Sequence, residues 1–64
     1  MKVNGQQVAL KQGQTLLVFL TAAQYDCRTI AVERNGVIVP KAEYESICLE
    51  DQDTIEIVRF VGGG

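Results

Sequence analysis

The sequence predicts an α+β fold of two layers, in which one main helix packs across one face of a mixed β-sheet of four to five strands. Three observations lead to this prediction. Asn4-Gly5 and Asn35-Gly36 each lie between short runs of strand-forming residues, as in tight hairpin turns. Segment 16–25 carries apolar residues at helical spacing, and segment 54–61 is the longest strand candidate. Strands in this order around one helix bury their apolar faces economically as a sheet covered by that helix.

The N-terminal half predicts a hairpin followed by the helix. Residues 1–3 and 7–10 alternate as strands on either side of the first Asn-Gly turn. Thr15 is suited to cap a helix from Leu16 to about Tyr25, because its hydroxyl can accept a hydrogen bond from an unpaired backbone N–H group. The helix face expected to cover the sheet consists of Leu16, Phe19, Leu20 and Ala23.

The C-terminal half predicts the rest of the sheet. Residues 29–33 form a strand that the second Asn-Gly turn connects to residues 37–39, and Pro40 ends that strand. A short helical turn is expected within residues 41–46, and a turn at 50–53 precedes the final strand at 54–61. The first and last strands would lie in the middle of the sheet if they pair in parallel, and Ile55 and Ile57 point to the same face of the last strand.

Composition restricts the classes of function. The 64 residues form one domain, 1–61, followed by a glycine tail, 62–64. Six basic and eight acidic residues leave a net charge of -2 without a basic run, so nucleic acid is not an expected partner. No apolar stretch is long enough to span a bilayer, and the N-terminus lacks a signal-peptide pattern, so we expect a cytoplasmic protein with no membrane partner.

The side chains offer little chemistry of their own. The chain has no histidine, the usual general base at neutral pH, so self-contained catalysis is not expected. Cys27 and Cys48 are 21 residues apart without a second thiol near either, which argues against a metal centre. We expect these cysteines to be small buried hydrophobic residues, although a disulfide between them is geometrically possible.

The C-terminal Gly62-Gly63-Gly64 is the candidate reactive site. Glycine has no Cβ, so Gly62 and Gly63 can pass through a narrow channel that would exclude any side chain. Three extended residues reach roughly 10 Å, and they would present the Gly64 carboxylate to a partner. The alternative is a frayed terminus or a linker, because glycine is common at chain ends.

The order of elements and the terminal glycines resemble the ThiS family, the small sulfur carriers of thiamin biosynthesis with the ubiquitin-like β-grasp fold. The resemblance covers essentially the whole chain. The segments that carry it are Val3-Asn4-Gly5, Gly13-Gln14-Thr15-Leu16, residues 31–40 from Ala-Val-Glu-Arg to Ile-Val-Pro, residues 53–58, and the three final glycines. Each segment alone is weak, but together and in this order they are fairly specific.

The resemblance implies a mechanism carried out by partner enzymes on a carrier that is not itself an enzyme. A ubiquitin-activating-type adenylyltransferase would use ATP and Mg²⁺ to adenylate the Gly64 carboxylate, while the carrier binds no cofactor. A persulfide donor such as a cysteine desulfurase would then supply sulfur. The resulting thiocarboxylate would be consumed by thiazole synthase during formation of the thiazole ring.

The resemblance also points to a docking surface and to one position at which this sequence differs from the usual family pattern. If Ile55 and Ile57 face the helix, Val58 and Phe60 form an exposed apolar patch beside Val61 and the tail, and such patches often bind partners. The alternative is that Phe60 folds over an edge of the core. Family members usually have Gly-Asp before the last strand, whereas this chain has Gln52-Asp53, so the turn is either strained or differently shaped.

Two other functions begin with the same activation of the terminal carboxylate. One is sulfur delivery to molybdopterin or another metabolite. The other is protein modification, in which Gly64 is joined to a lysine of a target as in ubiquitin. A plain interaction module with incidental glycines is a third alternative.

Overall fold

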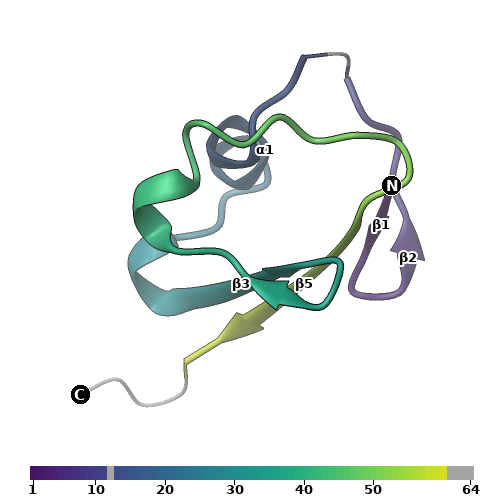
Figure 1. The fold of residues 1–64 in the computed structure, drawn as a ribbon. Coiled ribbons are helices and arrows are strands. Elements are labelled where there is room, and N and C mark those ends of the chain that lie inside the picture. Colours follow the sequence, from purple (N-terminus) through teal and green to yellow (C-terminus); the bar gives the residue numbers. More distant parts are fainter. Residues whose placement is uncertain (12, 61–64) are drawn as a thin grey trace.

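The computed structural model describes residues 1–11 and 13–60. Its elements, in chain order, are β1 (Lys2–Val3), β2 (Gln6–Gln7), helix α1 (Leu16–Ala22), the 3-10 helix η1 (Cys27–Thr29), β3 (Ile30–Arg34), β4 (Val37–Ile38), the 3-10 helix η2 (Lys41–Glu43) and β5 (Thr54–Arg59). Helix α1 lies against one side of the strands (Figure 1). The predicted α+β fold with one main helix is therefore confirmed. The glycine tail and Val61 lie outside the described residues.

The strands form one five-stranded mixed sheet in the order β2-β1-β5-β3-β4. The first strand pairs in parallel with the last, with Lys2 opposite Thr54 and Val3 opposite Ile55. All other pairings are antiparallel. The predicted central position of the first and last strands is confirmed, so β5, the strand that leads to the tail, is held on both sides.

The core lies between α1 and the sheet. Ile55 is fully buried and Ile57 is 7% exposed, which confirms the predicted inward face of β5. The buried apolar side chains are Met1, Val3, Leu16, Leu20, Ile30, Val32, Val39, Tyr44, Leu49, Ile55 and Ile57. Within the described ranges, no helix is long and apolar enough to cross a membrane.

Helix α1 begins where the sequence predicts and ends earlier. The Thr15 hydroxyl accepts a hydrogen bond from the Val18 N–H group at 3.2 Å. The helix ends at Ala22, because Gln24 adopts a left-handed conformation with φ of 67°. The N–H groups of Gln24 and Tyr25 then donate to the carbonyls of Thr21 and Leu20, at 3.0 and 2.9 Å. This is a Schellman cap, so the predicted helix end at Tyr25 was wrong.

Replacing Gln24 by glycine is expected to stabilise the fold. The left-handed conformation costs a residue with a Cβ about 1 kcal/mol, and glycine avoids that cost. Part of the gain is offset because glycine has more freedom in the unfolded chain. We expect the free energy of unfolding, measured by urea denaturation, to rise by about 0.5–1 kcal/mol. The control Gln24→Ala keeps the strain and should give no such increase.

The first hairpin is shorter than predicted. Strand β2 covers only Gln6–Gln7, so the prediction of a strand over 7–10 was wrong. The turn itself is as expected, with positive φ at Asn4 and Gly5. After Val8, whose N–H group donates to the Met1 carbonyl at 2.8 Å, the chain leaves the sheet toward the helix.

The turn before β5 is differently shaped rather than strained. Gln52 is not among the residues with positive φ, and the Asp53 N–H group donates to the Glu50 carbonyl at 3.0 Å. The Asp53 side chain is 3% exposed and accepts hydrogen bonds from three groups. These donors are Arg34 Nε at 3.0 Å, Asn35 Nδ2 at 3.0 Å and the Glu50 N–H group at 2.9 Å. Asp53 thus ties the β3-β4 turn to the start of β5.

Candidate functional site

The described part of the candidate site is the end of β5, from which the chain continues to the tail. Val58 and Phe60 are 56% and 55% exposed, so Phe60 does not fold over the core, and the predicted apolar patch is present. The Phe60 N–H group donates to the Thr29 carbonyl at 2.8 Å, which holds the backbone to the sheet beyond the end of the strand. The route toward the tail therefore starts from a fixed point.

Two cations lie over aromatic rings near this end of the molecule. Lys41 Nζ is 5.7 Å from the centre of the Phe60 ring, and the Arg59 guanidinium is 5.2 Å from that of Tyr25. At these distances each cation is attracted to the face of the ring. Arg59 is exposed, and the Tyr25 ring that it contacts belongs to the segment after α1.

The outer face of the sheet continues the patch. Ala31 lies opposite Val58, and Glu33 lies opposite both Glu56 on β5 and Ile38 on β4. Ile38 is 68% exposed. We define Val58, Phe60, Ala31 and Ile38 as the outer apolar patch, with Glu33 and Glu56 beside it. It combines apolar contact area with two carboxylates, which suits recognition of a protein surface.

Asn4 positions β5 in a way that the sequence did not reveal. Its Oδ1 accepts a hydrogen bond from the Ile57 N–H group at 2.7 Å, and its Nδ2 donates to the Ile57 carbonyl at 3.2 Å. The side chain thereby continues the pairing of β5 beyond the end of β1. An Asn-Gly pair signals only the turn, so this second role of Asn4 could not be predicted.

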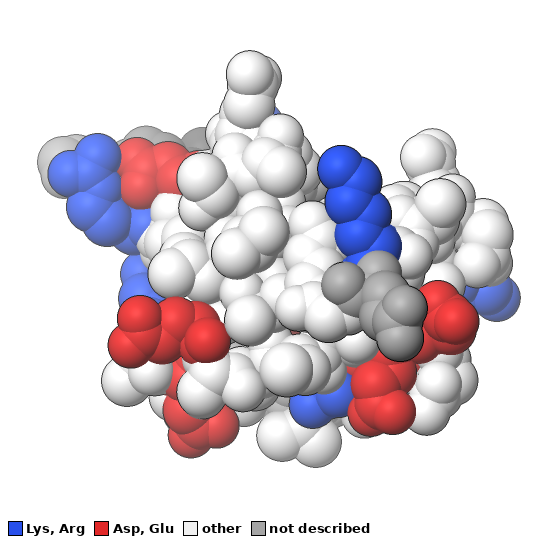
Figure 2. Space-filling model, turned by 90° about the horizontal axis from the view of Figure 1, so that it is seen from above, with Lys and Arg blue, Asp and Glu red and all other residues white. Residues whose placement is uncertain are grey.

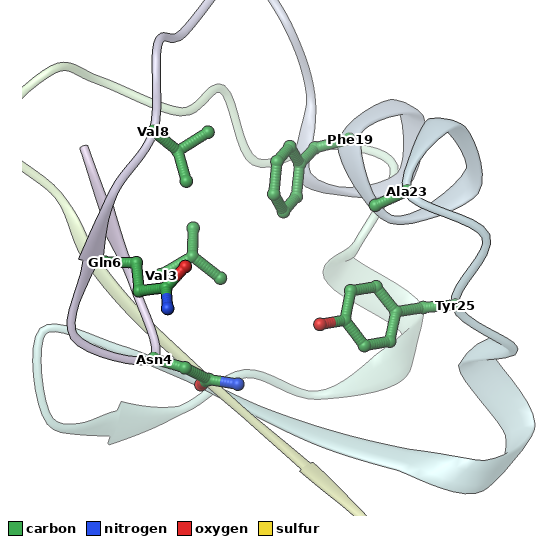
Figure 3. A pocket seen from close by; sticks show the side chains of 7 residues that line it. All are labelled: Val3, Asn4, Gln6, Val8, Phe19, Ala23 and Tyr25. Atoms are coloured by element: carbon green, nitrogen blue, oxygen red, sulfur yellow. The ribbon is translucent and has the colours of Figure 1, made fainter.

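A groove separates the first hairpin from α1 (Figure 3). It has a volume of ≈ 470 Å³ and is lined by Val3, Asn4, Gln6, Val8, Phe19, Ala23 and Tyr25. The aromatic rings of Phe19 and Tyr25 form one wall, and the polar groups of the lining side chains are the Asn4 and Gln6 amides and the Tyr25 hydroxyl. None of these seven side chains is a carboxylate, thiol or amine, so the groove suits binding rather than acid–base chemistry.

The charged side chains do not form a large single-sign surface on the face drawn in Figure 2. There, the charged residues form small groups, in some of which positive and negative side chains touch, and uncharged surface lies between the groups. Within residues 1–11 and 13–60, no three His, Cys, Asp or Glu side chains are placed to hold a metal ion.

The two cysteines are free thiols. Cys27 is half-buried and packs against the core, close to the expectation for a small hydrophobic residue. Cys48 is exposed, so its expected burial was wrong. The backbone of Cys48 forms a single antiparallel β-bridge with that of Thr15, just before α1. The side chain that enters the core in this segment is that of the adjacent Leu49.

Comparison with known proteins decides the family. The model of the ThiS family matches residues 1–64. This chain belongs to the ThiS family. It is similar over its whole length to the sulfur carrier protein ThiS of Bacillus subtilis, with 40% identity over 65 residues that cover 98% of that protein.

A solved structure shows the same fold. The crystal structure of a thiamine biosynthesis protein (ThiS) from Geobacter metallireducens superposes with a TM-score of 0.78 at 26% identity, and the match covers 98% of this chain and 96% of that one. The resemblance to the ThiS family and the ubiquitin-like β-grasp fold are therefore confirmed.

The chain is also similar to part of a larger protein. The thiazole synthase of Paramagnetospirillum magneticum is 40% identical over 62 residues, which cover 97% of this chain. A second thiazole synthase, from Magnetococcus marinus, is 36% identical over 62 residues. The chain spans about a fifth of the length of these two relatives, 19% in each case.

Proposed function

We propose that this chain is a sulfur carrier of thiamin biosynthesis that holds sulfur as a thiocarboxylate on Gly64 and delivers it to thiazole synthase. The observation that carries the proposal is the full-length match to the ThiS family together with the similar segments within two thiazole synthases. A carrier-like segment within the same polypeptide as a synthase supports a working contact between the two. The Bacillus subtilis relative is itself named as a sulfur carrier protein, which supports the carrier part of the proposal.

The chemistry needs an activated carboxylate. A carboxylate is a poor electrophile, so the adenylyltransferase joins the Gly64 carboxylate to AMP from ATP, with Mg²⁺ on the phosphates and pyrophosphate as the leaving group. The terminal sulfur of a persulfide then attacks the carbonyl and displaces AMP. A thiol breaks the sulfur–sulfur bond, which leaves the thiocarboxylate on Gly64 and a disulfide on the donor side. The acceptor of the sulfur is thiazole synthase.

The described residues support a carrier that supplies position rather than catalysis. β5 is paired with a strand on both sides, and the Asn4 side chain extends the pairing with β1. The Phe60 N–H group donates a hydrogen bond to the Thr29 carbonyl, so the chain is held to the sheet as far as Phe60. Val58 and Phe60 present exposed apolar area at the C-terminal end of the described chain. Gly62 and Gly63 would supply passage and reach, and Gly64 the reacting carboxylate.

The proposal is tested on protein isolated from its native host. Alkylation followed by digestion and mass spectrometry should find sulfur in place of one terminal oxygen on the peptide that ends in Gly63-Gly64. The adduct must be mapped to the tail, because a single oxidation of Met1, Cys27 or Cys48 adds nearly the same mass. Gly64 found only in isopeptide linkage to other proteins would instead identify a protein modifier and refute the carrier proposal.

Replacing Phe60 by alanine is expected to weaken partner binding. An exposed aromatic side chain at the centre of a contact typically contributes more than 1 kcal/mol, so the dissociation constants for the activating enzyme and thiazole synthase should rise about tenfold. Isothermal titration calorimetry measures both. Thr54→Ala, on the same face at the other end of β5, is the matched control and should have little effect. Unchanged affinity of Phe60→Ala for both partners would refute docking at this patch.

A further inference from the structure

The outer edge of β4 is an exposed strand edge with apolar side chains on both faces. β4 is the last strand of the sheet on the side of β3 (Figure 1). Val37 and Ile38 are 67% and 68% exposed, the two highest values among the large hydrophobic residues that the structure describes. Proteins usually protect such an edge with charged side chains, because its free backbone groups can pair with another strand.

The hydrogen-bond pattern leaves the backbone of Ile38 facing outward. Arg34 and Val37 close the two-residue Asn-Gly turn, and the Val39 N–H group donates to the Val32 carbonyl at 2.9 Å. In an antiparallel ladder, residues alternate between pointing toward the partner strand and away from it. Ile38 lies between two residues that bond to β3, so its N–H and C=O groups point away from the sheet. They can bond to one residue of an added strand.

Side chains on both sides of this edge fit an apolar strand. On the helix side, a groove of ≈ 360 Å³ is lined by Arg34, Asn35, Val37, Ile38, Val39, Pro40, Glu43 and Ile47. On the other side, Ile38 belongs to the outer apolar patch. Since side chains of an added strand alternate between the two faces, one would enter the groove and the next would lie against Ile38.

The charges beside the edge are acidic. Glu43 lies in the groove, and Glu33 lies opposite Ile38 on the outer face. The ion pairs of the described residues join Arg28 to Asp26, and Arg34 to Glu50 and Asp53, so they include neither of these glutamates. Arg34, the one cation that lines the groove, thus already forms ion pairs with two other carboxylates. A strand with basic residues beside its apolar ones would complement Glu33 and Glu43.

The opposite edge of the sheet provides an internal comparison. β2 also follows an Asn-Gly turn, and Gln7 lies opposite Lys2 as Ile38 lies opposite Glu33. Its backbone edge is equivalent, but its side chains are Gln6 and Gln7. A comparison of peptide binding at the two edges therefore separates the contribution of free backbone groups from that of the apolar and acidic side chains around β4.

We propose that the β4 edge is a docking site for an extended apolar and basic segment of a partner protein, which adds a strand to the sheet beside β4. This surface goes beyond the proposed sulfur chemistry, because it concerns a part of the molecule other than the tail. The β4 edge contributes the free backbone groups of Ile38. The partner segment contributes apolar side chains on both of its faces and lysine or arginine residues beside them.

The test is an NMR titration of the full chain with the peptide acetyl-Lys-Lys-Val-Val-Val-Lys-Lys-amide, which as a strand presents valine and lysine on both faces. Binding should shift the amide resonances of Gly36 to Val39 and slow hydrogen exchange at Ile38 about tenfold at saturation, while Gln6 and Gln7 stay unchanged. Ile38→Lys should weaken binding about tenfold. Glu43→Gln should weaken it about two- to fivefold, as expected for an exposed ion pair. Gln7→Lys at the other edge is the matched control.

Three results would overturn the proposal. The first is equal binding of the same peptide N-methylated at its central residue, which could not form the strand hydrogen bonds. The second is a shift pattern centred on β2 or on the groove beside α1. The third is self-association of the chain that protects the Ile38 amide without peptide, which would make a second copy the occupant. None of these readouts depends on sulfur transfer, so failure here is distinguishable from failure of the carrier function.

Discussion

Removing Gly64 is expected to abolish adenylation of this carrier without changing its fold. The deletion withdraws the terminal carboxyl carbon by about 3.3–3.6 Å, the length of one extended residue. A displacement of about 1 Å at a reacting centre can cost about a hundredfold in rate, so adenylate formation should fall by at least that factor. The core consists of side chains between Met1 and Ile57, so thermal unfolding should be unchanged.

A matched control separates the carboxylate from the length of the tail. A chain that ends in the carboxamide of Gly64 keeps every residue but lacks the reacting oxygen, and it should be as inactive as the deletion. ATP–pyrophosphate exchange with the activating enzyme measures both variants. Thiazole formation supported by the truncated chain would show that the terminus is not the reactive site.

Replacing Asp53 by alanine is expected to lower the free energy of unfolding by about 2–4 kcal/mol. The substitution leaves Arg34, Asn35 and the Glu50 N–H group without the carboxylate to which they donate, and unpaired buried polar groups are costly. For a domain of this size the total is roughly 3–10 kcal/mol, so the loss is a large fraction. Urea denaturation measures it.

The contribution of Asp53 should depend on pH. Burial alone would raise the pKa of Asp53, but hydrogen bonds from Asn35, the Glu50 N–H group and Arg34 outweigh it, so the pKa of Asp53 in the folded chain lies below its ordinary value. The unfolded value is about 3.9. Stability from Asp53 is therefore present above about pH 4 and is lost as the pH falls through the lower folded pKa.

The neighbouring Asp51 is the matched control for this prediction. It is exposed and lies in the same turn, so Asp51→Ala should change the free energy of unfolding by less than about 0.5 kcal/mol. Below about pH 4, the free energy of unfolding should depend less steeply on pH in Asp53→Asn than in the unmodified chain, and Asp51→Asn should leave this dependence unchanged. Equal effects at the two positions would contradict the role of Asp53 as the link between β3 and β5.

Elements with a strong local signal could be predicted from the sequence. The two Asn-Gly turns, the Thr15 cap and the alternation of Ile55 and Ile57 each depend on residues close in the chain, and all are confirmed. The helix end could not be predicted, because glutamine rarely adopts the left-handed conformation that Gln24 takes. The short β2 was also missed, because apolar residues after Gln7 look like a strand whether or not they find a partner.

Long-range polar contacts account for most of what the sequence did not show. Asp53 looked like part of a surface turn, but its burial depends on Arg34 and Asn35, which are 19 and 18 residues away. The bond between Asn4 and Ile57 joins residues 53 apart in the chain. At the candidate site, strand alternation placed Val58 and Phe60 on the same face, but only the structure, in which Phe60 is 55% exposed, decided against a position of Phe60 over the edge of the core. The roles of Val61, Gly62, Gly63 and Gly64 stay predictions.

The transfer of labelled sulfur from this chain to the thiazole tests the central claim most directly. The carrier is loaded with a heavy sulfur isotope on Gly64, purified, and mixed with thiazole synthase and its other substrates for a single turnover. The sulfur-carrier proposal predicts that the label appears in the thiazole product and that the chain returns to a Gly64 carboxylate. Label that stays on the chain while thiazole forms with unlabelled sulfur would contradict it.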